Sequence, residues 1–214
     1  MNDVKIAADV DIRAGYLTAA ELKLAASLIY QAYHDDPVFI DIFDTGSGDY
    51  EQKLRASIRE ELAAFWQAKQ PILGIYLGEA LAGVACLHMP AAGFGSDRFW
   101  HWRLKMMLSA GYVSTKQMIQ KEEQIIAAVP MQRFHILSFI AIHPLHQHHG
   151  FGHYLLAAVN TVLDDEPESE GLAIYVTSDK YKEFFKECDY EVLTEISVGN
   201  VTGPLMVHYR ENQA

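Results

Sequence analysis

The sequence predicts a mixed α/β protein built around a single sheet, and three observations carry this prediction. Apolar residues recur at helical spacing in residues 22–33 and again in residues 54–66. Two apolar runs, 72–77 and 81–89, are joined by Gly78-Glu79-Ala80, which is the pattern of a β-hairpin. The run 134–142 is almost continuously apolar, as in a strand that is covered on both faces. Helices that alternate with strands in this way favour one sheet flanked by helices.

The first elements are marked by clear start and stop signals. Thr18 and Glu21 have the spacing of a capping box at the start of the first helix, and Pro37 predicts that this helix ends near His34. A turn cluster at residues 45–49 precedes the second helix, which stops before Pro71. The predicted hairpin comes next.

The middle and the end of the chain alternate between helix and strand signals. Residues 90–95 read as a loop, and 97–110 and 115–128 as two helices inserted before the central strand. After that strand, the pattern predicts a helix through 154–163, a strand at 172–177 and a short helix at 179–188. Two further strands are expected at 190–198 and 205–209.

Length and charge exclude several classes of protein. The chain has 214 residues, which suits a single domain over residues 1–214. Half of the residues are hydrophobic, so the chain is not disordered. With 17 basic and 28 acidic residues, the net charge is −11. Duplex nucleic acids and anionic membranes both need basic patches, so we expect neither as a partner.

The expected compartment is the cytoplasm. The first residues, 1–6, lack the apolar run of a signal peptide, and no stretch approaches the roughly 18 apolar residues of a membrane span. Cys86 and Cys188 are too few for a disulfide framework and are expected to be free thiols.

The most informative motif lies between the buried strand and the helix after it. It reads Gln147-x-x-Gly150-x-Gly152. Glycines allow a tight turn there, and the N–H groups at a helix N-terminus can bind an anion without any basic side chain. The motif lacks the Gly-Lys-Ser/Thr of a Walker loop and the third glycine of a dinucleotide fingerprint. A plain strand-to-helix turn remains the alternative.

The segment around this motif resembles a known family. Residues 137–156, LSFIAIHPLHQHHGFGHYLL, are similar without a gap to the acetyl-coenzyme A loop of the GNAT superfamily of N-acetyltransferases. Residues 32–37 resemble the Phe-x-x-Asp-Pro segment that ends the first helix in one branch of that family, and 175–178 resemble its Leu-Glu-Thr-Ser strand. The resemblance implies a mostly antiparallel GNAT-like fold whose helical insertion, about 97–128, precedes the central strand.

The resemblance also implies which residues bind acetyl-coenzyme A. Backbone groups of the central strand would pair with the pantetheine arm, and backbone N–H groups of the loop would hold the pyrophosphate. Phe185, in the last helix, would also contact the cofactor. His149 stands where the family often has Lys or Arg. The residues concerned are Phe139, Ile140, Ala141 and Ile142 in the strand, and Gln147, His148, His149, Gly150, Phe151 and Gly152 in the loop.

The proton donor departs from the family pattern. The family's usual tyrosine, which protonates the departing thiolate, is Phe185 here. Tyr181 lies four residues earlier, on the same helix face, so our hypothesis gives it the acid role. Two alternatives stay open: its ring merely packs, or the reaction needs no enzyme acid, since a thiol with a pKa of about 8.5 leaves readily.

The general base and the acceptor site have several candidates. His143 and Asp36 are the preferred bases, with Asp35 and His135 as further candidates. Aromatic side chains would wall the acceptor pocket, unless they pack in the core instead. Those preferred are Tyr30, Tyr33 and Trp100, and other aromatic residues beside the inserted helices are Phe94, Phe99 and Trp102.

A metal site is not expected. Five histidines fall between residues 143 and 153, and His149 and His153 have i,i+4 spacing. A solvated cluster is the interpretation we prefer, because the loop already has a matched role in anion binding.

The sequence therefore predicts an acetyl-CoA-dependent N-acetyltransferase that acts on the amine of a small molecule by direct attack in a ternary complex. The main alternative is a coenzyme A-binding module that has lost catalysis. A third interpretation is a metal-binding protein built on the histidine cluster. The acceptor is not readable, although an acidic chain suits a cationic amine. A homodimer is the default expectation for an oligomer.

Overall fold

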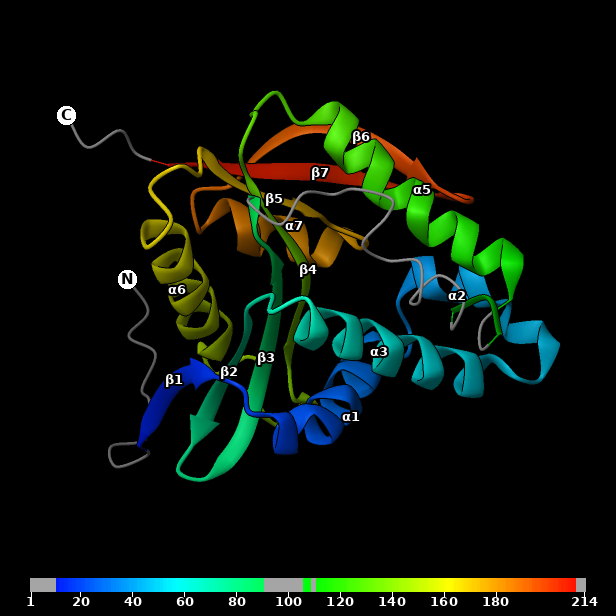
Figure 1. Ribbon diagram of the computed structural model, residues 1–214, viewed down its shortest axis with the longest axis horizontal. Helices are drawn as coiled ribbons and strands as arrows, with labels where there is room; N and C mark the ends of the chain where they lie inside the picture. The colour runs from blue at the N-terminus through cyan, green and yellow to red at the C-terminus, as the bar shows by residue number, and fades with distance from the viewer. Residues whose placement is uncertain (1–10, 91–105, 109–110, 211–214) are drawn as a thin grey trace.

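The computed structural model describes residues 11–90, 106–108 and 111–210. These form a seven-stranded sheet in the order β1-β2-β3-β4-β5-β7-β6 (Figure 1). Neighbouring strands are antiparallel except β4 and β5, which are parallel. The strands are β1 (Ile12–Tyr16), β2 (Ile72–Leu77), β3 (Ala80–His88), β4 (His135–Ile142), β5 (Gly171–Tyr175), β6 (Glu191–Val198) and β7 (Val201–Tyr209).

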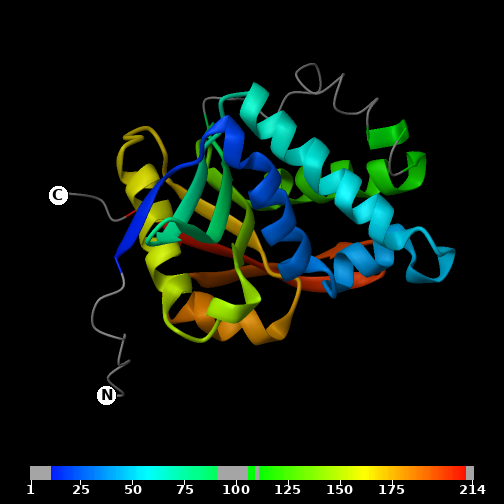
Figure 2. The same ribbon diagram turned by 90° about the horizontal axis from the view of Figure 1, so that it is seen from below.

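Helices cover both faces of this sheet. On one face lie α1, α2, α3 and α5, and on the other lie α6 and α7 (Figure 2). Each face has its own hydrophobic core, because alternate residues of the central strands point to opposite sides. The helices are α1 (Leu22–Tyr33), α2 (Pro37–Phe43), α3 (Tyr50–Gln67), α5 (Tyr112–Ala128), α6 (Phe151–Asp164) and α7 (Asp179–Lys186).

Most predicted elements are present. The first helix ends at Tyr33, the hairpin is β2 and β3, and the central strand is β4, whose residues are buried or half-buried. The order of the elements is therefore the predicted one. The predicted helix at 97–110 falls largely outside the described residues, although 106–108 are helical.

Two elements were not predicted. The edge strand β1 is short and half-exposed, so it has no clear apolar alternation. The helix α2 begins at Pro37 directly after Asp36, whose side chain accepts hydrogen bonds from the N–H groups of Val38 and Phe39. This is an ordinary helix start. Pro37 thus marks both the end of α1, as the sequence predicts, and the start of α2.

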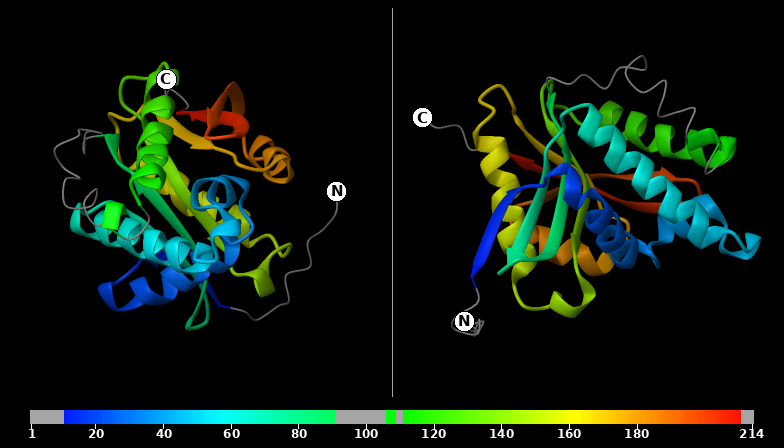
Figure 3. Two further views of the ribbon diagram at one scale, coloured as in Figure 1. Left: turned by 90° about the vertical axis from the view of Figure 1, so that its right-hand side faces the viewer. Right: turned by 60° about the horizontal axis from the view of Figure 1, so that its bottom comes forward.

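The parallel pair at the centre of the sheet is very short. β4 and β5 pair only through His135–Leu172 and Ile136–Ala173. Beyond these residues the two strands lead away from each other (Figure 3). We call this region the β4–β5 fork, defined as residues 137–142 of β4 and 174–177 at the end of β5.

Candidate functional site

A β-bulge opens the fork. On β3, Cys86 and Leu87 are consecutive, but their partners on β4 are Phe139 and Leu137. Ser138 is therefore an extra residue in β4. A bulge bends a strand and increases its twist, and this one follows directly after the last residue of β4 that pairs with β5. The bulge thus explains why the strands separate at this point.

Alternate residues of β4 present their peptide groups to the fork. The hydroxyl of Tyr33 donates to the carbonyl of Ile140 and accepts from its N–H, both at 3.2 Å. The Gln147 amide donates to the carbonyl of Ile142 at 3.0 Å. In a strand, successive residues direct their polar groups to opposite edges, so Phe139 and Ala141 face β3. Of the four strand residues implied by the resemblance, Ile140 and Ile142 are thus the ones whose peptide groups face the fork, where Tyr33 and Gln147 bond them.

The corner between α1 and α2 joins the two arms of the fork. Tyr33, the last residue of α1, reaches Ile140 on β4. Asp36, the cap of α2, accepts a hydrogen bond from the hydroxyl of Thr177, just beyond β5. Two side chains three residues apart thus attach the corner to both strands. The α1–α2 corner therefore covers the fork on the face of α1.

The glycine motif forms the turn into α6. His148 and Gly150 have positive φ angles of 63° and 81°, and Gly150 is the residue before the first turn of the helix. Among the described residues, no acceptor is recorded for the N–H groups from His148 to Gly152. Five consecutive donors at a helix N-terminus make a site for an anion. The structure thus favours the anion site over the plain turn.

The second glycine of the motif has a different role. A Cβ on Gly152 would lie 3.2 Å from the ring of Phe184 on α7. Phe184 also packs edge-on against His153, with ring centroids 5.0 Å apart. Gly152 therefore lets α7 pack closely on the first turn of α6.

The residues of α7 face different environments. Phe185 is buried in the core beneath α6 and α7, in ring contact with Phe184 and Tyr190. Tyr181 is 39% exposed, in the first turn of the helix. It is close enough to Tyr33 for its charge to contribute to the raised pKa of that phenol. Tyr181 thus interacts electrostatically with a residue of the fork, whereas Phe185 packs in the core.

The base candidates are spread over the site. His143 follows β4 directly, and its Nδ1 accepts from the N–H of Leu145. Asp36 is buried and its carboxylate already accepts three hydrogen bonds. Because these bonds hold α2 and the end of β5 in place, the carboxylate is poorly suited to act as a base. Asp35 is exposed. His143 therefore remains the preferred base, since the Asp36 carboxylate is engaged by α2 and Thr177.

His135 has a structural environment. The Nδ1 of His135 lies 2.8 Å from the hydroxyl of Ser169, which itself donates to the carbonyl of Gly171, and the Nε2 of His135 lies 3.1 Å from the sulfur of Met89. Burial, helped by the charge of Arg210, lowers the pKa of His135 to about 4. It also lies where β4 and β5 still pair, before the fork begins. We therefore assign it to the support of the sheet.

Among the described residues, the aromatic side chains that were expected to wall the acceptor pocket do not lie together. Tyr33 lies in the fork, as described. Tyr30 is buried under the guanidinium of Arg55, which lies 3.5 Å from its ring centroid. Trp100, like Phe94, Phe99 and Trp102, lies outside the described residues. Neither a cluster of three or more potential metal ligands nor a helix able to cross a membrane occurs in the described part of the chain.

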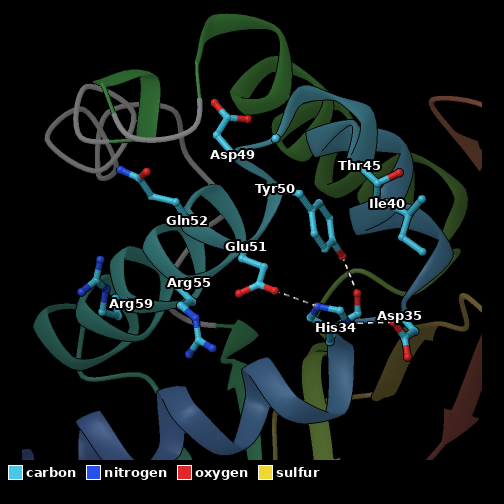
Figure 4. A pocket seen from close by; sticks show the side chains of 11 residues that line it. His34, Asp35, Ile40, Thr45, Asp49, Tyr50, Glu51, Gln52, Arg55 and Arg59 are labelled. Carbon is cyan, nitrogen blue, oxygen red and sulfur yellow. Dashed lines mark hydrogen bonds and ion pairs between the residues drawn. The ribbon is translucent and has the colours of Figure 1, made fainter.

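A surface pocket of about 750 Å³ lies on the other side of the α1–α2 corner. His34 and Asp35 line it together with residues of α3, and Tyr50 donates to the carbonyl of His34 (Figure 4). The corner therefore presents His34 and Asp35 to the pocket, and Tyr33 and Asp36 to the fork. Because the pocket has neither the strand edge nor the donor loop, the fork is the stronger candidate for catalysis.

Two contributors carry no site prediction from the sequence: Ser138 forms the bulge, and Thr177 joins Asp36 to β5. Tyr33, predicted as part of the acceptor wall, binds the edge of β4. A polar residue inside the apolar run 134–142 was a signal for the bulge. The contact between Asp36 and Thr177 spans 141 positions, so no local pattern could reveal it.

Comparison with known proteins finds similarity at the level of structure. No family profile and no curated protein matches the chain. A histone acetyltransferase HPA2 and related acetyltransferase from Corynebacterium glutamicum superposes with a TM-score of 0.69 at 16% identity, covering 95% of this chain and 99% of that one. A GCN5-related N-acetyltransferase from Rhodopseudomonas palustris gives 0.57 at 12% identity, covering 96% and 98%.

A third similar structure contains the cofactor. The PaiA N-acetyltransferase from Thermoplasma acidophilum, in complex with coenzyme A, gives a TM-score of 0.58 at 11% identity, covering 94% of this chain and 99% of that one. These likenesses extend over nearly the whole length of both partners. The chain therefore has the acyl-CoA N-acyltransferase fold of the GNAT superfamily, as its central motif predicts.

Proposed function

We propose that this protein transfers an acetyl group from acetyl-CoA to the amine of a small molecule. The proposal rests on one observation: the edge of β4 that no longer pairs with β5 lies next to a loop of N–H donors. The fork leaves peptide groups of Ile140 and Ile142 directed away from β3, and the loop after β4 holds five N–H donors. An elongated ligand with an amide-containing arm and a phosphate group fits such a pair of features.

The chain's own residues would hold the two parts of this ligand differently. The pantetheine amides would pair with the strand edge as a further strand would, displacing the Gln147 amide from the Ile142 carbonyl. The N–H groups from His148 to Gly152 would bind the pyrophosphate, aided by the dipole of α6. The Nδ1–H of His149 donates to the Gln147 carbonyl at 2.6 Å and fixes the shape of the loop.

The cofactor would supply an acyl carbon activated as a thioester, and the chain would supply orientation and electrostatics. The N–H of Ile140 would donate to the thioester oxygen as negative charge develops there. His143 would take the proton of the amine, directly or through water. A covalent route through Cys86 is disfavoured, because the thiol is fully buried and burial raises its pKa.

The second candidate function is coenzyme A binding without catalysis. It is favoured by Phe185, which stands where the family has its tyrosine and packs in the core without a hydroxyl. The two candidates predict the same binding and differ in turnover. An amine panel with acetyl-CoA therefore separates them.

The test of the proposal compares Gly150→Ala with Gly78→Ala. Both glycines have positive φ, so each substitution carries a similar backbone cost of roughly 1 kcal/mol. Gly78 lies in the β2–β3 turn, where an added Cβ meets nothing within 4 Å. By calorimetry, we expect wild type and Gly78→Ala to bind CoA alike, and Gly150→Ala to bind at least about tenfold more weakly.

The outcomes separate the candidates. Transfer to an amine by the wild type, lost with CoA binding in Gly150→Ala, supports the enzyme. Tight binding without turnover on any amine supports the binding module. Absence of CoA binding by the wild type would refute both.

A further inference from the structure

Tyr33 brings a hydroxyl to the edge of β4 that faces the fork. Its Oη lies 3.2 Å from both the nitrogen and the carbonyl oxygen of Ile140. One phenol oxygen therefore occupies the acceptor position of the Ile140 N–H, while its hydrogen is directed to the carbonyl of the same residue. The proposed reaction uses this same N–H to bind the thioester oxygen.

The ring that carries this hydroxyl is firmly held. Phe39 and Phe139 pack against it edge-on, with centroid distances of 5.8 and 5.5 Å. The attachment of Asp36 to Thr177 fixes the corner three residues later. Burial, opposed by the bond to the Ile140 carbonyl and reinforced by the charge of Asp36, raises the pKa of the Tyr33 phenol above its ordinary value. Such a phenol keeps its proton, so it acts as a hydrogen-bond donor and not as an acid.

We propose that Tyr33 is an oxyanion donor of the transferase site, a role that rests on the function proposed above. A thioester oxygen that shares the Ile140 N–H with the phenol oxygen lies beside the phenol, whose O–H turns from the Ile140 carbonyl to this oxygen. No bond forms or breaks at Tyr33 and no proton leaves it. The contact strengthens as charge develops on the oxygen, so it acts mainly on kcat.

The experiment uses Tyr33→Phe, which keeps the ring and removes the hydroxyl. The probes are CoA and a ketone analogue of acetyl-CoA in which a methylene group replaces the sulfur, so that the carbonyl is present but cannot be transferred. Loss of one buried hydrogen bond predicts that the analogue binds about five- to tenfold more weakly to the variant. The dissociation constant of CoA, which has no carbonyl at that position, stays within about twofold. KM for acetyl-CoA rises no more than the dissociation constant of the analogue, and kcat falls about 10²-fold.

Tyr50→Phe is the matched control. Its hydroxyl also donates to a backbone carbonyl of the α1–α2 corner, that of His34, but on the side of the pocket. We expect this variant to bind both probes as the wild type does. If Tyr33→Phe does not fold, 3-fluorotyrosine at position 33 retains both bonds to Ile140, and as a stronger donor it should tighten binding of the analogue without affecting CoA.

The results separate this inference from the proposed function. If the wild type binds CoA but Tyr33→Phe binds both probes as tightly as before and keeps its kcat, the hydroxyl merely fills the strand edge and the inference is wrong. The same holds if 3-fluorotyrosine leaves binding of the analogue unchanged. If the wild type binds neither probe, the proposed function fails, and the inference fails with it.

Discussion

Tyr181 is the side chain whose chemistry matters most after Tyr33. It is 39% exposed, in the first turn of α7. If it protonates the departing thiolate, Tyr181→Phe should lower kcat about 10²-fold, since general acids contribute on this scale.

The control for this prediction is Tyr209→Phe, which removes a similarly exposed hydroxyl from β7. A full turnover rate in Tyr181→Phe would rule out the acid role. The thiolate would then leave without an enzyme acid.

Glu61 makes the stability of the protein depend on pH. It is buried in α3, and burial, reinforced by the charge of Glu122, raises its pKa to about 8. In the unfolded chain the carboxyl has its ordinary pKa near 4.5. Between these values the folded state holds a proton that the unfolded state has lost, so stability falls as pH rises, by up to about 1.4 kcal/mol per pH unit.

Glu61→Gln should remove this dependence. Thermal unfolding between pH 5 and pH 8 should show that the Tm of the variant rises relative to that of the wild type as pH rises. Glu195→Gln makes the same change of charge at an exposed position of β6 and serves as control. Parallel pH curves for the wild type and Glu61→Gln would contradict the prediction.

At the scale of elements, α2 is attached to the hairpin of β6 and β7. Asp41 of α2 accepts from the backbone N–H of Asn200 at 2.9 Å and from its side-chain amide at 2.7 Å. Gly199 has a φ of +60°, and a Cβ there would lie 2.0 Å from the Asp41 carboxylate. The close approach of carboxylate and turn therefore depends on glycine.

Gly199→Ala should destabilise the protein by roughly 1–3 kcal/mol, more than Gly78→Ala, which has the same φ but open space around it. The additional loss of stability comes from the clash with Asp41, so Gly199→Ala should destabilise the protein less in the background of Asp41→Ala. Chemical denaturation of the four members of this double-mutant cycle measures the coupling. Strictly additive free energies of unfolding would show that the contact has no energetic weight.

For the whole molecule, the net charge of −11 has a measurable consequence for cofactor binding. A phosphate site made of backbone N–H groups releases no counterions, and the acidic surface repels an anion. We therefore expect the dissociation constant of CoA to stay level or to fall as KCl rises from about 50 to 300 mM. A tenfold loss of affinity over this range would instead indicate a site built from lysine and arginine side chains.

The sequence was sufficient for those features that depend on local pattern. The apolar run of β4, the hairpin and the glycine turn before α6 are encoded in consecutive residues, and the structure contains all of them. The helix α2 was missed although Asp36 and Pro37 encode its start. The fork could not be predicted in detail, because it depends on a bulge at Ser138 and on contacts of Tyr33 and Asp36 with distant strands.

The fork has one further consequence, for aggregation. From Leu137 onward β4 is a strand edge inside a sheet, and exposed edges invite pairing with another chain. Here the Tyr33 hydroxyl and the Gln147 amide already bond the peptide groups that such an intruder would need. The same two side chains thus also protect the strand edge from β-strand addition by another chain. A variant that lacks both the Tyr33 hydroxyl and the Gln147 amide should self-associate on storage, unless CoA is present to occupy the strand edge.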